Sequence, residues 1–66
     1  MVDTNKLRGC IVANGKTQAE VAEEIGMSAK TFCLKMKKKV FGSDEIEKMI
    51  DLLNIEDPMS VFFARK

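Results

Sequence analysis

The sequence predicts an all-α fold, a compact bundle of about five short helices. Apolar residues recur three and four positions apart, and no stretch alternates apolar and polar residues as a half-buried strand does. The single proline, Pro58, lies outside every predicted helix interior. A chain of 66 residues has room for one compact domain, which we expect to span residues 1–66.

The first helix is predicted over residues 5–13. Leu7 and Ile11 stand one helical turn apart and mark its buried face. Asn14 and Gly15 follow directly, and this pair is typical of a helix that stops in a left-handed backbone conformation. The chain therefore turns at this point, before a second helix.

A capping box predicts the start of that second helix. Thr17 and Glu20 have the spacing at which the hydroxyl and the carboxylate each accept a hydrogen bond from the other residue's backbone N–H. Gly26 ends the helix after about two turns. Its apolar stripe consists of Val21, Ala22 and Ile25.

The third helix is predicted over residues 28–38. Ser28 is its expected N-cap and follows only two residues after Gly26, so the second and third helices must cross at a large angle. Phe32 and Met36 stand one turn apart and supply the buried face. The remaining sides carry lysines and weakly apolar residues, which makes the helix basic where it meets solvent.

Two more helices complete the bundle. Ser43 is predicted to cap the fourth, whose apolar residues are Ile46, Met49, Ile50 and Leu53. Asp57 and Pro58 predict the start of a short fifth helix, as a cap followed by proline at the first helical position. Its apolar residues are Met59, Phe62 and Phe63. The methionines expected to fill the core are Met27, Met36, Met49 and Met59.

Charge is polarised along the chain, although its net value is only +1. Residues 28–43 hold five lysines and no acid, which gives +5. Residues 44–58 hold six acids and one lysine, which gives −5. A basic run is often only a solvated surface, and the residues around it decide between that interpretation and a binding function.

The composition argues against an enzyme and against a bound metal or cofactor. The chain has no histidine, no glycine-rich phosphate loop and no visible base beside either cysteine. Cys10 and Cys33 alone cannot provide the four ligands of zinc, and we expect both to be reduced and at least half-buried. No apolar run approaches the roughly 20 residues that span a bilayer, and no secretory signal is visible, so we expect a cytoplasmic protein without membrane contact.

The corner between the second and third helices carries a recognisable set of residues. They read Gln18-x-x-Val21-Ala22-x-x-Ile25-Gly26-Met27-Ser28-x-x-Thr31-Phe32. Ala22 is small enough to let the two helices approach, and Gly26 suits the unusual backbone conformation of the turn. This set resembles the helix-turn-helix of the phage Cro and repressor proteins and their bacterial relatives, the lambda repressor-like family. The resemblance extends from Leu7 through the fourth predicted helix.

The resemblance implies a transcriptional regulator of phage or prophage origin that binds double-stranded DNA sequence-specifically, within a bacterial cell. Its helix-turn-helix would span about residues 17–38, with the helix over 28–38 in the major groove. The base-reading positions implied are Ala29, Lys30, Cys33 and Leu34. The positions implied near the DNA backbone are Gln18, Ser28, Thr31, Lys37, Lys38 and Lys39. No small-molecule effector is expected.

Two departures from the family pattern affect this interpretation. The family usually has an apolar residue where this chain has Lys35, and Met36 takes over the packing role, which can rotate or shorten the recognition helix. That helix also lacks Arg, Asn and Gln, the side chains that make bidentate base contacts, so direct readout should be modest. Specificity would then depend on DNA shape or on two paired half-sites.

The alternative function is a protein-interaction module, built on the same fold, that binds a partner repressor. The acidic fourth helix, together with Met59, Phe62 and Phe63, is the candidate surface for such a partner. A homodimer is also expected if two copies bind paired half-sites. Its candidate contact is the C-terminal run Val61-Phe62-Phe63.

Overall fold

The helices predicted from the sequence are present in the computed structural model, which describes residues 1–63. Within that range the chain forms helices, turns and bends but no strand, so the all-α prediction is confirmed. The helices are α1 (Thr4–Ala13), α2 (Gln18–Glu24), α3 (Ala29–Lys38), α4 (Ser43–Leu53) and α5 (Pro58–Phe62). The last three residues of the single domain expected over 1–66 lie outside the described residues.

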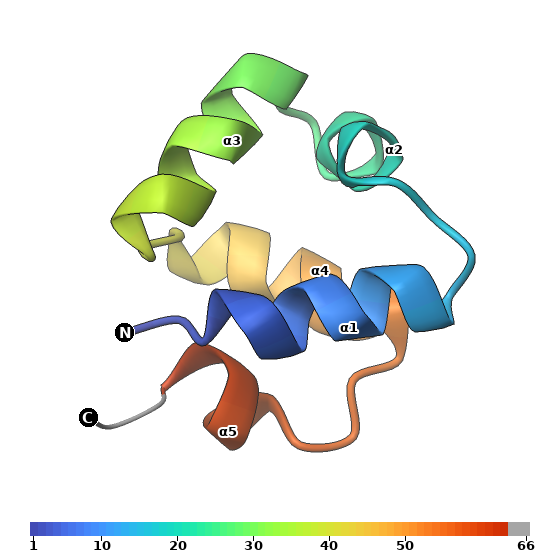
Figure 1. The fold of residues 1–66 in the computed structure, drawn as a ribbon, viewed down its shortest axis with the longest axis vertical. Coiled ribbons are helices and arrows are strands. Elements are labelled where there is room, and N and C mark those ends of the chain that lie inside the picture. The colour runs from blue at the N-terminus through green and yellow to red at the C-terminus, as the bar shows by residue number, and fades with distance from the viewer. Residues whose placement is uncertain (64–66) are drawn as a thin grey trace.

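The molecule measures 28 × 22 × 19 Å. Figure 1 shows α1 and α4 across the middle, α2 and the first turns of α3 at one end, and α5 at the other end. No helix within residues 1–63 has the length and apolar character needed to cross a membrane.

Side-chain caps fix most helix starts where the sequence predicts them. The capping box of α2 is confirmed, because Thr17 Oγ1 accepts from Glu20 N at 3.1 Å and Glu20 Oε1 accepts from Thr17 N at 2.8 Å. Asp57 caps α5, and Pro58 is its first residue, as predicted. Helix α1 begins one residue earlier than predicted, since Asp3 caps it and accepts from Lys6 N at 3.1 Å.

The predicted cap of α4 is wrong by one residue. Ser43 is the first residue of the helix, and Gly42 occupies the N-cap position without a side chain to contribute. The Glu45 carboxylate compensates, because its Oε1 accepts a hydrogen bond from the Gly42 N–H at 2.8 Å. The start of α4 is therefore fixed by a side chain that lies inside the helix.

The corner between α2 and α3 forms as the sequence predicts. Gly26 has φ +86°, a left-handed conformation that glycine adopts without the steric cost other residues carry. Directly after it, Met27 N donates to Ala22 O at 2.9 Å. Val21 and Ala22 are fully buried, and α2 and α3 are in contact.

Asn14 joins the ends of two helices that are far apart in the sequence. It follows α1, and its side-chain Nδ2 donates to Cys10 O at 2.8 Å within the same helical turn. The same nitrogen donates to Leu53 O, the last carbonyl of α4, at 2.9 Å. Asn14, which the sequence predicts at the end of α1, therefore also connects α1 to α4.

Two core residues lie outside the predicted helices, where helical periodicity gives no indication of burial: Val2 and Phe41. Val2 is buried ahead of α1, and its N–H donates to Lys39 O at 3.1 Å. Phe41 is buried in the loop before α4, and its ring lies 5.3 Å from that of Phe32 at an interplanar angle of 56°. Both residues lie outside the helices and pack against them.

Several burial predictions at the C-terminal end need correction. Met59 does not fill the core, because 66% of its surface is exposed on the short helix α5. Val61 and Phe62 are buried inside the molecule, so only Phe63 remains exposed in the run expected to form a dimer contact. Phe62 is likewise removed from the candidate surface for a partner repressor. Asp3 N donates to Val61 O at 2.7 Å and closes α5 onto the N-terminal segment.

Candidate functional site

Helix α3 is the element on which most of the predicted site residues lie. Ser28 Oγ caps it and accepts from Thr31 N at 3.1 Å. Phe32 and Met36 anchor it to the core, and the helix extends over ten residues, or about 15 Å. The presence of Lys35 in place of an apolar residue therefore does not shorten it relative to the predicted range.

The predicted site residues are brought together on the solvent side of α3. Those that are exposed on α3 or at its ends are Ser28, Ala29, Lys30, Thr31, Cys33, Leu34, Lys37, Lys38 and Lys39. Gln18 is half-buried at the start of α2, apart from this continuous segment. Lys30, Leu34 and Lys37 lie on the face of α3 opposite Phe32 and Met36, as the helical period requires. Lys30 is exposed to solvent and Leu34 is 49% exposed.

The two cysteines differ in exposure. Cys10 is half-buried against the core, as expected. Cys33 is exposed, which contradicts the expectation that it is at least half-buried. It lies on the outer side of α3 because Phe32 beside it occupies the buried face. Both thiols are free.

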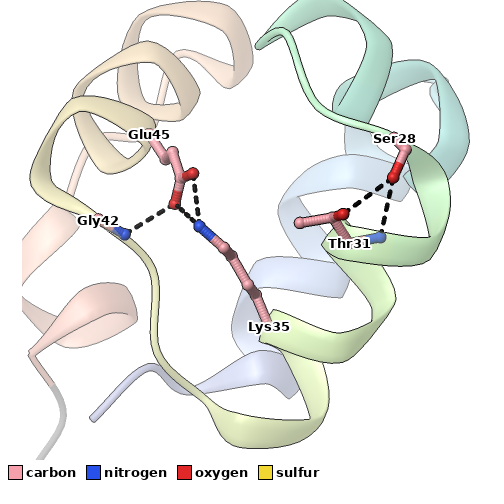
Figure 2. Close-up of polar contacts among 5 residues, drawn as sticks. All are labelled: Ser28, Thr31, Lys35, Gly42 and Glu45. Atoms are coloured by element: carbon pink, nitrogen blue, oxygen red, sulfur yellow. Dashed lines mark hydrogen bonds and ion pairs between the residues drawn. The ribbon is translucent and has the colours of Figure 1, made fainter.

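The hydroxyls of Ser28 and Thr31 are not equivalent. Ser28 Oγ accepts from Thr31 N and donates to Thr31 Oγ1 at 2.9 Å, so its proton and one lone pair are engaged within the helix start (Figure 2). Thr31 Oγ1 accepts that bond and keeps its own proton to donate outward. Ser28 and Thr31 are the two hydroxyl residues among those expected near the DNA backbone, and of these two Thr31 is the one left able to donate.

One of the five lysines predicted as a basic run is neutralised within the molecule. Lys35 extends from α3 across the intervening turn to Glu45 on α4, and its Nζ lies 2.8 Å and 2.6 Å from the two carboxylate oxygens (Figure 2). Helical periodicity places Lys35 beside the buried face, where a charge needs a partner. Within residues 1–63 the other four, Lys30, Lys37, Lys38 and Lys39, form no ion pair.

The electrostatics of Glu45 follow from these contacts. The hydrogen bond from Lys35 is the main cause that holds the pKa of the Glu45 carboxyl below its ordinary value of 4.5. Burial opposes this shift, and the Gly42 N–H adds to it. Glu45 therefore joins the end of α3, the loop at Gly42 and the first turn of α4 through one carboxylate.

The Glu45 contacts predict a loss of stability in acid. Because the carboxyl has a lower pKa in the folded chain than in the unfolded one, its contribution is complete above about pH 4.5 and disappears as the pH falls through the folded pKa. We expect Glu45→Gln to lower the free energy of unfolding by about 1 kcal/mol near neutral pH, a value limited by solvent screening, and by almost nothing once the carboxyl is protonated. Urea unfolding followed by circular dichroism at a series of pH values measures both quantities.

The matched control for this experiment is Glu47→Gln. Glu47 is exposed on the same helix and forms no ion pair within the described residues. We expect its replacement to leave stability unchanged within about 0.5 kcal/mol across the same pH range. A Glu45→Gln variant with the same pH profile as the wild-type protein would contradict the role of the Lys35–Glu45 pair.

Comparison with protein families gives a match over nearly the whole chain. The profile of a family described as protein of unknown function (DUF739) matches residues 1–64. The chain belongs to this family. The DUF739 match includes all five helices and every candidate site residue from Gln18 to Lys39. No curated protein and no solved structure matches the chain.

Sequence reasoning did not find Glu45 or the loop residues next to α3. Val40 and Phe41 lie beside Leu34 and Lys38, along one side of the helix. A signal for Glu45 is present in the sequence, since it stands three residues after Gly42 at a helix start. Its partner Lys35 belongs to another helix, and no local pattern connects the two.

Proposed function

We propose that this DUF739 protein binds double-stranded DNA sequence-specifically and regulates transcription in the manner of the Cro and repressor proteins. The observation that carries the proposal is the outer face of α3, on which Lys30 and Leu34 are exposed to solvent, with three lysines at its end that form no ion pair within residues 1–63. A helix with its side chains is about 10–12 Å across and fits a major groove about 12 Å wide.

The chemistry of this face supports direct contacts with bases. Lys30 is able to donate hydrogen bonds to guanine N7 and O6, and the methyl groups of Ala29 and Leu34 suit contact with a thymine methyl. Figure 1 supports access to a duplex, because the first turns of α3 lie at the end of the molecule opposite α5.

The groups around this face support contacts with the DNA backbone. Lys37, Lys38 and Lys39 are exposed cations at one end of α3. Thr31 retains a hydroxyl donor, and Gln18 begins α2, where helix N-terminal N–H groups favour a phosphate. Such contacts give affinity and orientation, and the bases give sequence preference.

The corner between α2 and α3 supports the lambda repressor-like assignment. Its short helices, the buried Ala22 and the left-handed Gly26 are the features on which the resemblance rests. Because one domain covers about half of a twofold operator, we expect a homodimer on paired half-sites about 34–36 Å apart.

Selection from random duplexes at two salt concentrations tests the proposal, with Lys30→Ala as the informative variant. We expect the wild-type protein to enrich a short motif. Lys30→Ala should weaken binding to that motif by about 1–3 kcal/mol and relax the preference at one base pair. The matched control is Lys48→Ala, an exposed lysine on α4. Enrichment of the same motif by Lys30→Ala would show that the base-reading face is assigned incorrectly.

A protein-interaction module remains the second candidate, favoured by the exposure of Met59 and Phe63 at the end of the molecule that carries α5. The dependence on salt separates the two functions. DNA binding through several lysines lowers the logarithm of affinity steeply with the logarithm of salt concentration, by about 0.9 per phosphate neutralised. Absence of duplex binding even at low salt, together with capture of a repressor, would favour the module.

A further inference from the structure

One flank of α3 borders a groove that the proposed DNA contacts use only in part. The groove has a volume of about 380 Å³ and lies between α3 and the loop that leads to α4. Its lining comprises Thr31, Leu34, Lys35 and Lys38 from α3, and Val40 and Phe41 from the loop. The volume is at the lower end of the range for ligand sites, which suits one or two side chains of a partner.

The walls of this groove are apolar and in part exposed to solvent. Leu34 on α3 is 49% exposed, and Val40 in the loop is 63% exposed. Phe41 contributes a nearly buried wall whose ring is held against Phe32. Two exposed aliphatic side chains and one fixed aromatic ring that line the same groove are able to receive one apolar anchor residue.

The rim of the groove is positively charged. Lys38 is exposed there and forms no ion pair within residues 1–63. Lys35, which also lines the groove, is paired with Glu45. Residues 28–43 contain no acid. The complementary ligand therefore carries negative charge next to an apolar group.

We propose that this groove binds an acidic segment of a second protein. One large apolar side chain of that segment lies between Leu34 and Val40, and a neighbouring carboxylate pairs with Lys38. DNA does not suit the groove, because a sugar-phosphate backbone has no apolar side chain to insert between Leu34 and Val40. Lys30 and Lys37, the outward-facing cations of α3, do not line it.

The position of the groove couples it to the outer face of α3. Leu34 and Lys38 belong both to the groove and to the surface proposed to contact DNA. A bound acidic segment and a DNA duplex would therefore exclude each other. Only this competition rests on the proposed DNA-binding function. The groove itself requires only the charges and the apolar walls described above.

Selection of displayed random peptides on the full chain tests the proposal. We expect the selected peptides to carry Asp or Glu next to a single large apolar residue. A synthetic copy of the most enriched peptide should bind Val40→Ser and Lys38→Ala about tenfold more weakly than the wild-type protein. Met59→Ser is the matched control, since Met59 is equally exposed but lies on α5, and it should bind the peptide like the wild type.

Both variants keep the fold, because Val40 and Lys38 are exposed, and thermal unfolding checks this directly. Failure to enrich acidic apolar peptides, or equal peptide binding by wild type and Val40→Ser, would overturn the proposal. A duplex of the sequence selected above should displace the peptide, whereas Val40→Ser should retain duplex binding. If the peptide binds and no duplex does, the groove assignment holds and the DNA-binding proposal fails.

Discussion

Replacing Lys37, Lys38 and Lys39 together by alanine is expected to remove most of the affinity for DNA. The three side chains are exposed at the end of α3 and have no internal ion pair to lose. If each neutralises one phosphate, the slope of log affinity against log salt concentration should flatten by about 2.7, and affinity near physiological salt should fall roughly a hundredfold. Fluorescence anisotropy with a labelled duplex over a salt series measures both quantities.

The control for this triple variant changes the net charge equally. Lys6, Arg8 and Lys48 are exposed on α1 and α4, and their joint replacement by alanine also removes three positive charges. We expect only a small loss of affinity, because no direct phosphate contact is removed and long-range attraction is screened by salt. Equal losses in the two triple variants would mean that net charge, and not α3, determines binding.

Phe32→Ala is expected to unfold the domain. Phe32 is 1% exposed, packs against Phe41 and lies on the face of α3 that contacts the core. Removing a buried phenyl ring costs about 3–5 kcal/mol, and a chain of this size has a total stability of about the same magnitude. Far-ultraviolet circular dichroism with urea titration should therefore show little helix even without denaturant.

A second aromatic residue provides the comparison for this prediction. Phe63 is 53% exposed, so Phe63→Ala should change the free energy of unfolding by no more than about 0.5 kcal/mol. Phe32→Leu retains most of the buried volume and should remain folded with a smaller loss. If Phe32→Ala were as stable as Phe63→Ala, the packing of α3 on the core would be incorrectly described.

The parts of the fold that the sequence predicts correctly depend on neighbouring residues in the chain. The capping box at Thr17, the left-handed Gly26 and the Ser28 cap are each determined within one helical turn. The spacing of Phe32 and Met36 then orients α3 toward the core. Nearly all the candidate site residues lie on this locally determined segment, so their exposure follows from the helical period once its buried face is known.

The incorrect predictions concern ends and short elements. Gly42 and Ser43 are both acceptable N-caps, and only the Glu45 contact selects Gly42. Helix α5 has five residues, too few for a periodic pattern to define its buried face, and for this reason the pattern wrongly predicts Met59 in the core. With so short a helix, its packing against the N-terminal segment determines which side chains are buried.

The residues that sequence reasoning missed depend on contacts between distant segments. Val2 is buried because the N-terminal segment is hydrogen-bonded to the end of α3. Phe41 is buried because its ring packs against that of Phe32. The Lys35–Glu45 pair joins two helices, so it changes the net charge of the basic run only after the chain has folded. No local pattern carries this information.

The Asn14 side chain has a consequence for how the domain opens. Because one amide group holds the last carbonyl of α4 and a carbonyl in the final turn of α1, these two ends cannot fray independently. Their backbone amides should exchange with deuterated solvent at similar rates, as one cooperative unit. The C-terminal ends of α1 and α4 would then unfold together in a single step, while the N-terminal end of α1 keeps the hydrogen bond from Asp3 N to Val61 O.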